Sequence, residues 1–313
     1  MAKKSPRQTI SSALTMLRGR PVVRVIFAGE YCGQIHAGIG QAAREKDLFL
    51  DDWSSAVVAE RPPPSGVLVV GAGETDCRVA VARLGGRVER LPVEMVCLED
   101  RGFSTAEHRD CWRPDWTAAG ALLARHVHAL QLPHVVCWER RKSSGLWQGF
   151  ARELGRLGQP PAARWCLAEE ISFGDVSVFS ADAQAWLLRK LALLPRPGVV
   201  VAEDDQMAYL VVMTARRLHL RVPEHVAVLG VGDCLAAQEK CPVSLSSVDM
   251  NWSRLGYLAA SRLARRLAGA TREEESARLV VPQGVVERES TRQFYSEDEA
   301  VARTVQRIRR DFA

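Results

Sequence analysis

The segment 197–233 constrains the fold more than any other part of the chain, because its hydrophobic pattern changes from that of a strand to that of a helix and back. Val199–Ala202 is a short apolar run of the kind that fills a buried parallel strand. A second such run, 226–231, follows Pro223. Between the two runs, residues recur at the spacing of one helix face: Met207, Leu210, Val211, Thr214 and Leu218. The segment therefore predicts one strand–helix–strand unit.

The same alternation of patterns runs through the rest of the chain. Strands are expected at 22–28, 67–71, 93–98, 135–138, 164–167, in a run that ends at 248, and at 278–287. Helices are expected at 34–46, 80–84, 116–130, 146–157 and 181–194. A further helix is expected after 248, with Gly269 as its C-terminal cap and with one face formed by Leu255, Leu258, Ala259, Leu263 and Leu267. Strands that alternate with helices indicate an α/β protein whose mostly parallel sheets carry helices on both faces.

Two neighbouring acids stand where the first strand of the opening unit ends and its helix begins. Asp204 and Asp205 are placed to accept hydrogen bonds from the free N–H groups of the first helical turn. Ligands of open α/β sheets also bind at the carboxyl ends of the strands. A helix cap and a ligand contact are therefore both open for these two carboxylates.

Length and composition describe an ordinary globular chain. The 313 residues suggest two lobes, and the net charge of +5 indicates nucleic acid only weakly because the basic residues are spread along the sequence. The eight Cys include no CxxC pair and predict buried thiols in a reducing cytosol. The N-terminus lacks a signal-peptide pattern, and no apolar run approaches the roughly 20 residues of a membrane span. We expect a soluble cytoplasmic protein with no membrane contact.

Motifs of enzymes and metal sites are absent from the sequence. There is no GxSxG elbow, no P-loop and no HExxH motif, and the seven His are not spaced as metal ligands. Gly71 and Gly73 begin a dinucleotide fingerprint, but Asp76 occupies the place of its third glycine, and a turn after a buried strand accounts for both glycines. We therefore expect no enzyme, no cofactor and no metal.

Several stretches of the second half resemble a known family. The sequences AEDDQMA, RVPEHVAVLGVGD, CPVSLSSVDMNWSRLGYLAASRL and VVPQGVVERES resemble the effector-binding region of LacI-type transcription regulators, and the resemblance runs from about residue 22 to 290. It is strongest to the xylose-operon activator (XylR-like) branch of AraC-type regulators. The resemblance implies a periplasmic-binding-protein-like type I fold, in which two doubly wound Rossmann-like lobes are joined by three crossovers and enclose a small molecule.

The same resemblance implies how the chain is divided. After a polar lead, 1–20, the first lobe takes 21–131 and 249–270, and the second takes 132–248 and 278–288. The tail, 291–313, resembles the start of an AraC-type DNA-binding domain, so DNA contact is expected only through a missing or truncated helix-turn-helix domain. A small-molecule effector and a second copy of the chain, in a homodimer, are the expected partners.

Five site residues are implied by the positions that they occupy in the family pattern. Glu30 and Tyr31 follow the first strand, where relatives line the pocket, although a solvent-exposed loop accounts for them equally well. Asp115 and Trp116 open a helix beside the expected cleft, and Asp115 is slightly favoured as an N-cap. Asp204 corresponds to the family residue that accepts hydrogen bonds from ligand hydroxyl groups.

Three further residues are candidates for ligand binding, and two of them lie where the chain departs from the family pattern. Trp147 stands beside Leu146, which replaces the arginine that holds ligand hydroxyls in relatives. Asp233 is the second acid of a pair whose first member is here Gly232. Trp252 is placed to stack on a sugar ring, although a core position is the commoner fate of a tryptophan. With these departures an ordinary hexose or pentose is in doubt, and either a more aromatic ligand or a pocket that no longer binds fits the sequence.

These observations predict the ligand-sensing region of a cytoplasmic transcription regulator. A small, sugar-like effector is expected to bind between the lobes and shift the population of closed molecules, and closure is expected to reposition attached DNA-binding domains. The alternative is a stand-alone cytosolic small-molecule-binding protein without DNA-binding activity.

Overall fold

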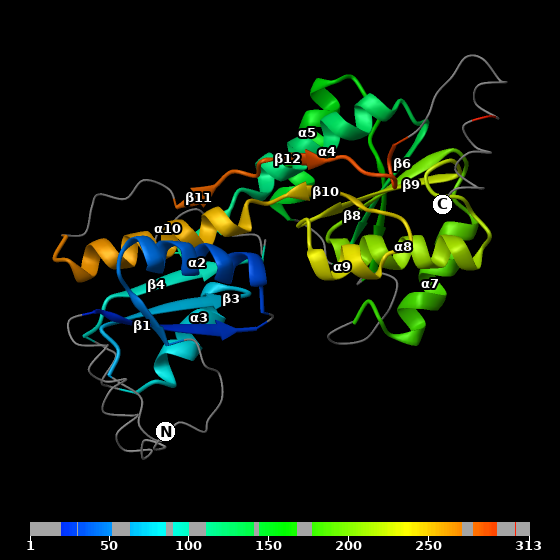
Figure 1. The fold of residues 1–313 in the computed structure, drawn as a ribbon. Helices are drawn as coiled ribbons and strands as arrows, with labels where there is room; N and C mark the ends of the chain where they lie inside the picture. Colours follow the sequence, from blue (N-terminus) through cyan, green and yellow to red (C-terminus); the bar gives the residue numbers. More distant parts are fainter. Residues whose placement is uncertain are drawn as a thin grey trace. The chain divides into compact units, whose positions relative to one another are not determined.

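The chain folds into two compact units, shown in Figure 1. The computed structural model describes residues 20–29, 31–51, 63–85, 90–99, 111–140, 144–167, 177–270 and 278–292, together with Thr304. Unit 1 takes the chain up to Asp115 and returns for Asn251–Val281, and unit 2 takes Trp116–Met250 and the chain from Pro282 onward. The chain thus crosses between the units three times, as the predicted fold class requires.

Unit 1 is built on a six-stranded parallel sheet with helices on both faces. Its strands, in spatial order, are β11 (Leu279–Val280), β5 (Cys111–Pro114), β4 (Val93–Cys97), β3 (Gly66–Gly71), β1 (Val22–Ala28) and β2 (Phe49–Asp51). Its helices are α2 (Gly33–Glu45), α3 (Glu74–Ala82) and α10 (Trp252–Leu267).

The alternation of side chains along β3 explains the three layers of unit 1. Leu68 and Val70 point to the face that α2 and α10 cover, whereas Val67 and Val69 point to the opposite face with Cys77 of α3. All five side chains are buried. A strand covered on both faces needs apolar residues at every position, which is why β3 reads as a continuous apolar run.

Unit 2 repeats this plan with a second six-stranded sheet. Its strands, in spatial order, are β12 (Gly284–Val286), β10 (Ser246–Asp249), β9 (Val226–Val231), β8 (Gly198–Ala202), β6 (His134–Glu139) and β7 (Ala163–Cys166), and β12 alone pairs antiparallel. Its helices are α4 (Trp116–Leu130), α5 (Gly145–Arg156), α7 (Ala181–Ala192), α8 (Asp205–Arg217) and α9 (Leu235–Lys240).

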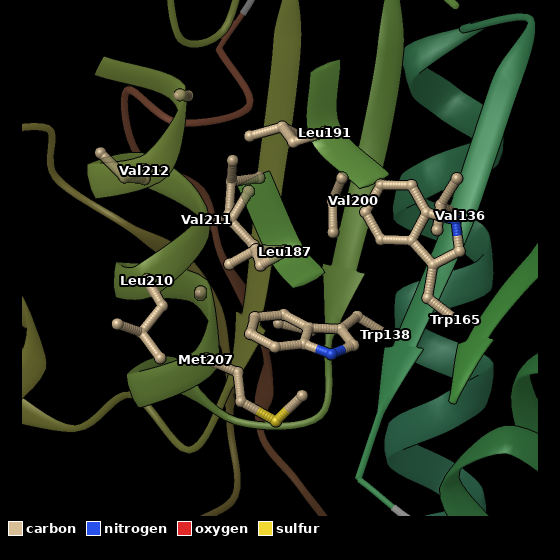
Figure 2. Close-up of a cluster of buried hydrophobic side chains, with 14 of the residues drawn as sticks. Val136, Trp138, Trp165, Leu187, Leu191, Val200, Met207, Leu210, Val211 and Val212 are labelled. Atoms are coloured by element: carbon tan, nitrogen blue, oxygen red, sulfur yellow. The ribbon is translucent and has the colours of Figure 1, made fainter. Parts of the chain in front are cut away.

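The core between the unit 2 sheet and helices α7 and α8 contains three tryptophans. Figure 2 shows Trp138 and Trp165, from β6 and β7, among the apolar side chains of this core. Trp186 of α7 lies 6.1 Å from Trp138 and 6.3 Å from Trp165 between ring centroids. Large aromatic side chains dominate the energy of a core because each buries so much surface. These three tryptophans are therefore core residues and not an aromatic lining for a ligand.

Glycines bring paired helices into close contact in each unit. A Cβ atom on Gly149 of α5 would lie 2.1 Å from the backbone oxygen of Thr117 in α4, and one on Gly120 of α4 would lie 1.9 Å from the backbone oxygen of Leu146. In unit 1, a Cβ on Gly256 of α10 would lie 2.2 Å from the backbone oxygen of Ile35 in α2. Figure 1 shows α10 alongside α2. Each helix pair depends on the absence of a side chain at its crossing point.

The predicted elements agree well with the structure, with four corrections. The strand expected at 278–287 is two short strands, β11 in unit 1 and β12 in unit 2, because the chain crosses between the units at 281–282. The helix expected at 80–84 is the longer α3. The first crossover lies at 115–116 and not at 131–132, because α4 packs on α5 of unit 2. Three short elements were not predicted: β2, β5 and α9.

Some predictions concern residues outside the described ranges. Residues 1–19 of the polar lead and most of the tail from 293 onward belong to this group. Among the described residues, the search for a helix with both the length and the apolar character of a membrane span found none.

The helix crossing in unit 2 gives a direct test of the packing. Gly149→Ala forces α4 and α5 apart, and we expect a loss of at least about 1–3 kcal/mol in the free energy of unfolding. The matched control is Gly155→Ala on the same helix, where no atom lies within 4 Å of the added Cβ. This change should stabilise unit 2 by roughly 0.5–1 kcal/mol. Urea unfolding measures both values, and equal effects of the two substitutions would contradict the proposed packing.

Candidate ligand site

The carboxyl ends of β6 and β8 bring charged side chains together in unit 2. The two strands pair in parallel, so the loops that follow them lie at the same edge of the sheet. The Glu203 N–H donates to the carbonyl of Trp138 at 3.1 Å, and the Arg140 N–H donates to Glu203 Oε2 at 2.7 Å. The Arg140 guanidinium forms an ion pair with Asp204. An acid and a base from two different loops thus lie in contact.

Asp204 has two separate roles. Its Oδ1 accepts a hydrogen bond from the Met207 N–H at 2.7 Å, which confirms the predicted N-cap of α8. Its Oδ2 contacts Arg140. The side chain of Asp204 is 29% exposed and that of Arg140 is 45% exposed. The pair therefore remains accessible to a solute, and the predicted ligand contact of Asp204 stays a prediction.

Asp205, the next residue, is buried and tied to two other segments. Its Oδ1 accepts from the Ser247 hydroxyl of β10 at 2.6 Å, and its Oδ2 accepts from the Cys234 N–H at 2.6 Å. Burial raises the pKa of Asp205 to about 6, against the two hydrogen bonds and Arg288, which lower it. Glycine at position 230 leaves room for this carboxylate, because a Cβ on Gly230 would lie 2.2 Å from Asp205 Oδ1.

Asp233 belongs to the same hydrogen-bonded network. Its N–H donates to the Ser247 hydroxyl at 3.0 Å, and its Oδ1 accepts from Arg288 Nη1 at 2.7 Å. The same Nη1 donates to the carbonyl of Leu245 at 2.8 Å. Gly232 has a φ of +123°, which strongly favours glycine over any other residue. The loss of the first family acid at this position is thus explained by the turn that directs Asp233 onto Ser247.

Three buried polar atoms at the end of β6 and the start of α5 have no hydrogen-bond partner among the described residues. They are the indole nitrogens of Trp138 and Trp147 and Oε2 of Glu139. The other carboxylate oxygen of Glu139 accepts from Arg164 Nε at 2.9 Å. A buried polar group without a partner costs about 1–3 kcal/mol, so such groups commonly mark a place for a ligand or a water.

The predicted Trp147 is a buried residue of the first turn of α5. It is 6% exposed, and its ring lies edge-on to Phe150 with 5.9 Å between centroids. Its backbone N–H donates to the Ser144 hydroxyl, the N-cap of the helix, at 3.4 Å. Trp147 is therefore part of the packed start of α5 and presents no exposed aromatic face.

The other described candidates are placed as follows. Tyr31 of unit 1 is 64% exposed, and its hydroxyl lies 2.7 Å from Nδ1 of His36. The Asp115 N–H donates to the Val280 carbonyl at 2.9 Å in unit 1, whereas Trp116 begins α4 in unit 2. Trp252 begins α10 and packs partly against the unit 1 core. Glu30 lies outside the described residues.

The sequence features considered for cofactors and metals have structural roles where they are described. The Gly73 N–H donates to the Asp76 carboxylate at 2.9 Å, so the residue in place of the third fingerprint glycine satisfies a backbone donor at the start of α3. Within the described ranges, no group of three or more His, Cys, Asp or Glu side chains is placed to hold a metal ion. All eight cysteines are free thiols.

Fold and cluster together define a two-unit α/β protein with a polar site at strand ends, and comparison with known proteins gives its family. The model of the periplasmic binding protein-like domain matches residues 124–291, more than half of the 313 residues. The chain belongs to this family. The predicted fold class is thereby confirmed, and the resemblance to the effector regions of LacI-type and xylose regulators is borne out.

Individual relatives are regulators of transcription. The chain is 33% identical to the xylose operon regulatory protein of Escherichia coli strain K12 over 129 residues, 41% of this chain and 32% of that protein. A structure of the xylose-binding transcription activator xylR superposes with a TM-score of 0.68 at 21% identity, covering 94% of this chain and 75% of that one. A lac repressor dimer bound to operator and an anti-inducer gives 0.61 at 16%, covering 92% and 86%.

The comparisons also concern the extent of the chain and the predicted tail. The chain spans about a third of the length of the Escherichia coli relative that it matches. The family match ends at residue 291, where the tail begins, and the comparisons do not support the predicted AraC-family assignment. That assignment is withdrawn.

Sequence reasoning missed three residues of the site. Arg140 follows β6 directly, and its guanidinium forms an ion pair with Asp204. Asp205 was treated only as an alternative to Asp204, although its neighbour Gly230 carries a signal, since glycine at the end of a buried strand indicates a close approach. Arg288 gave no signal, because its contact with Asp233 spans 55 residues.

The pKa of Asp205 predicts how its contribution to stability changes with pH. In the unfolded chain this group titrates near 3.8, and in the folded protein near 6. Between these pH values the Asp205 carboxyl group is protonated in the folded state and ionised in the unfolded state. The contribution of Asp205 to stability therefore falls as the pH rises from about 4 to about 6. The difference in pKa corresponds to about 3 kcal/mol.

The measurement compares wild type with Asp205→Asn by urea unfolding at pH 4, 5.5 and 7. The variant does not titrate at this position, so the stability of wild type minus that of the variant should fall by roughly 2–2.5 kcal/mol between pH 4 and pH 7, because part of the full difference is already lost at pH 4. Asp182→Asn, at an exposed position in the first turn of α7, is the control. A difference that stays constant with pH would show that Asp205 is not buried as described.

Proposed function

We propose that this chain is the effector-binding region of a transcription regulator, and that its effector is a small polyhydroxylated molecule bound at the carboxyl ends of β6 and β8. The observation that carries the proposal is the accessible pair of Arg140 and Asp204, which lies in the segment matched by the family model. The regulators named among the relatives support the sensing role.

The chemistry of this pair suits a ligand with neighbouring hydroxyl groups. A carboxylate accepts hydrogen bonds and a guanidinium donates several in a fixed fork, so together they match the donors and acceptors of adjacent hydroxyls. Asp204 is held by the Met207 N–H, so its orientation needs no rearrangement on binding.

The wider assembly belongs to the same proposal. The xylR neighbour is described as xylose-binding, and the lac repressor neighbour as a dimer bound to operator. By analogy we propose a sugar-like effector, a homodimer in the cytoplasm and coupling to a DNA-binding part of the protein. Enclosure of the effector between two lobes also stays a prediction. No enzymatic activity is proposed, because the named relatives are regulators.

A thermal-shift screen with xylose, disaccharides, sugar acids and aromatic metabolites tests the proposal. A compound at 100 times its Kd adds about 2.7 kcal/mol to stability, which is readily measured. Asp204→Ser separates the two roles of this residue, because serine also caps helices well. We expect its stability to stay within about 0.5 kcal/mol of wild type and its affinity for the compound to fall roughly tenfold or more.

Arg140→Gln should weaken the same compound by a similar factor. The matched control is Arg125→Gln, an exposed arginine of unit 2 that pairs with Glu153 of α5, and it should leave the affinity unchanged. A compound that stabilises all of these variants equally would place the binding site elsewhere. If no compound of the panel stabilises the wild-type chain, the effector-binding function is rejected.

A further inference from the structure

A second charged cluster lies in unit 1 and is built around Glu94 of β4. This carboxylate is fully buried on the face of the sheet that α10 covers, where its neighbours Leu68 and Val96 belong to the apolar core. Its Oε2 accepts from the Trp112 indole N–H at 3.1 Å. A buried acid requires a positive partner to remain charged.

Glu94 has more than one such partner. Arg266 of α10 donates from Nη1 to Glu94 Oε1 at 2.9 Å and to the carbonyl of Val93 at 2.7 Å. Arg262, one helical turn earlier, approaches the same Oε1 with its Nε at 3.3 Å. Arg278 lies 3.8 Å from Oε2. Two guanidiniums therefore converge on one carboxylate oxygen, and a third stands beside the other.

The charges of this cluster are not balanced by its carboxylate. Arg262, Arg266 and Glu94 carry a formal charge of +1 between them, and Arg278 adds to the positive potential. Arg262 is 9% exposed, and its Nε donates no hydrogen bond within the described part of the chain. Burying a cation with incomplete pairing is costly, and the cost is removed when an anion completes the hydrogen bonds.

We propose that these arginines form a binding site for a small phosphate-like oxyanion. Arg262 and Arg266 are four residues apart on α10, so their side chains project from the same helix face. Guanidinium forks match the oxygens of phosphate or sulfate in pairs. Arg266 has 32% of its side chain exposed and gives the anion access, whereas the burial of Arg262 excludes a macromolecule. The site lies in unit 1 and does not rest on the proposed function.

The test measures the thermal midpoint of the whole chain against inorganic phosphate or sulfate, with sodium chloride at the same ionic strength as the reference. Wild type should show a saturable rise beyond that in chloride. Arg262→Gln and the more exposed Arg266→Gln should each lower the phosphate affinity roughly tenfold or more, since hydrogen bonds to charged groups contribute that much. Circular dichroism checks that each variant is folded. If one of the two variants does not fold, the other carries the test.

Arg254→Gln is the matched control. It removes the same charge from the same helix, but Arg254 is exposed and lies over the Tyr257 ring. This variant should keep the phosphate response of wild type. Equal loss of the response in all three arginine variants would mean that phosphate binding depends only on the net charge of the protein, and would overturn the proposal.

Glu94→Gln distinguishes a binding site from a purely structural ion cluster. Without its carboxylate the cluster lacks its only acid among the described contacts, so the variant should be less stable in chloride and should bind phosphate more tightly than wild type. A structural cluster would lose stability without gaining a phosphate response, and that result overturns the proposal.

The three glutamates at 273–275 lie outside the described residues and offer another source of carboxylate. If these carboxylates already pair with the arginines, wild type gives no phosphate response, and a variant with all three glutamates changed to glutamine gains one. That result also overturns the proposal. Because no effector is present in this assay, its failure leaves the effector screen on Arg140 and Asp204 unaffected.

Discussion

The geometry of the unit 2 site depends on the burial of one carboxyl group, that of Asp205. Its two hydrogen bonds join the first residue of α8 to the loop after β9 and to Ser247 of β10. Because this residue is held from both sides, the preceding Asp204 has a fixed position at the end of β8, where Arg140 reaches it. A buried group thus sets the orientation of the exposed group beside it, which is how a rigid fold positions a recognition side chain.

The two units share an architecture and use charge in opposite ways. In unit 2, the pair of Arg140 and Asp204 is balanced and accessible at the carboxyl ends of the strands. In unit 1, Glu94 lies within the sheet under α10, and the arginines around it outnumber it. Water screens an exposed ion pair, so a solute can replace one of its contacts at little cost. A buried charge without a partner carries a large desolvation cost, and binding a counterion removes much of it.

Much of the fold could be predicted from the sequence, because its central strands are apolar on both faces. The expected bounds of β1, β9 and α4 agree with the structure at both ends. The elements that escaped prediction are short or lie at an edge, such as β2, β5 and α9, where few residues are buried and the pattern has no room to repeat. The last strand was misread for a different reason, since nothing local in a run of strand-forming residues shows that its halves join two sheets.

For the site, the sequence by itself determined the chemistry at strand ends, with Asp204 before its helix and Asp233 after its strand. Asp204 accepts a hydrogen bond from the nearby Met207 N–H, and such an N-cap leaves a local pattern in the sequence. Only the tertiary structure decided that Arg140 faces Asp204, that Asp205 is the buried member of the pair, and that Arg288 holds Asp233. The ion pair of Arg140 and Asp204 joins residues 64 positions apart, and that of Arg288 and Asp233 joins residues 55 positions apart. Burial and ion pairing follow from how the strands are ordered in the sheet, which no short stretch of sequence encodes.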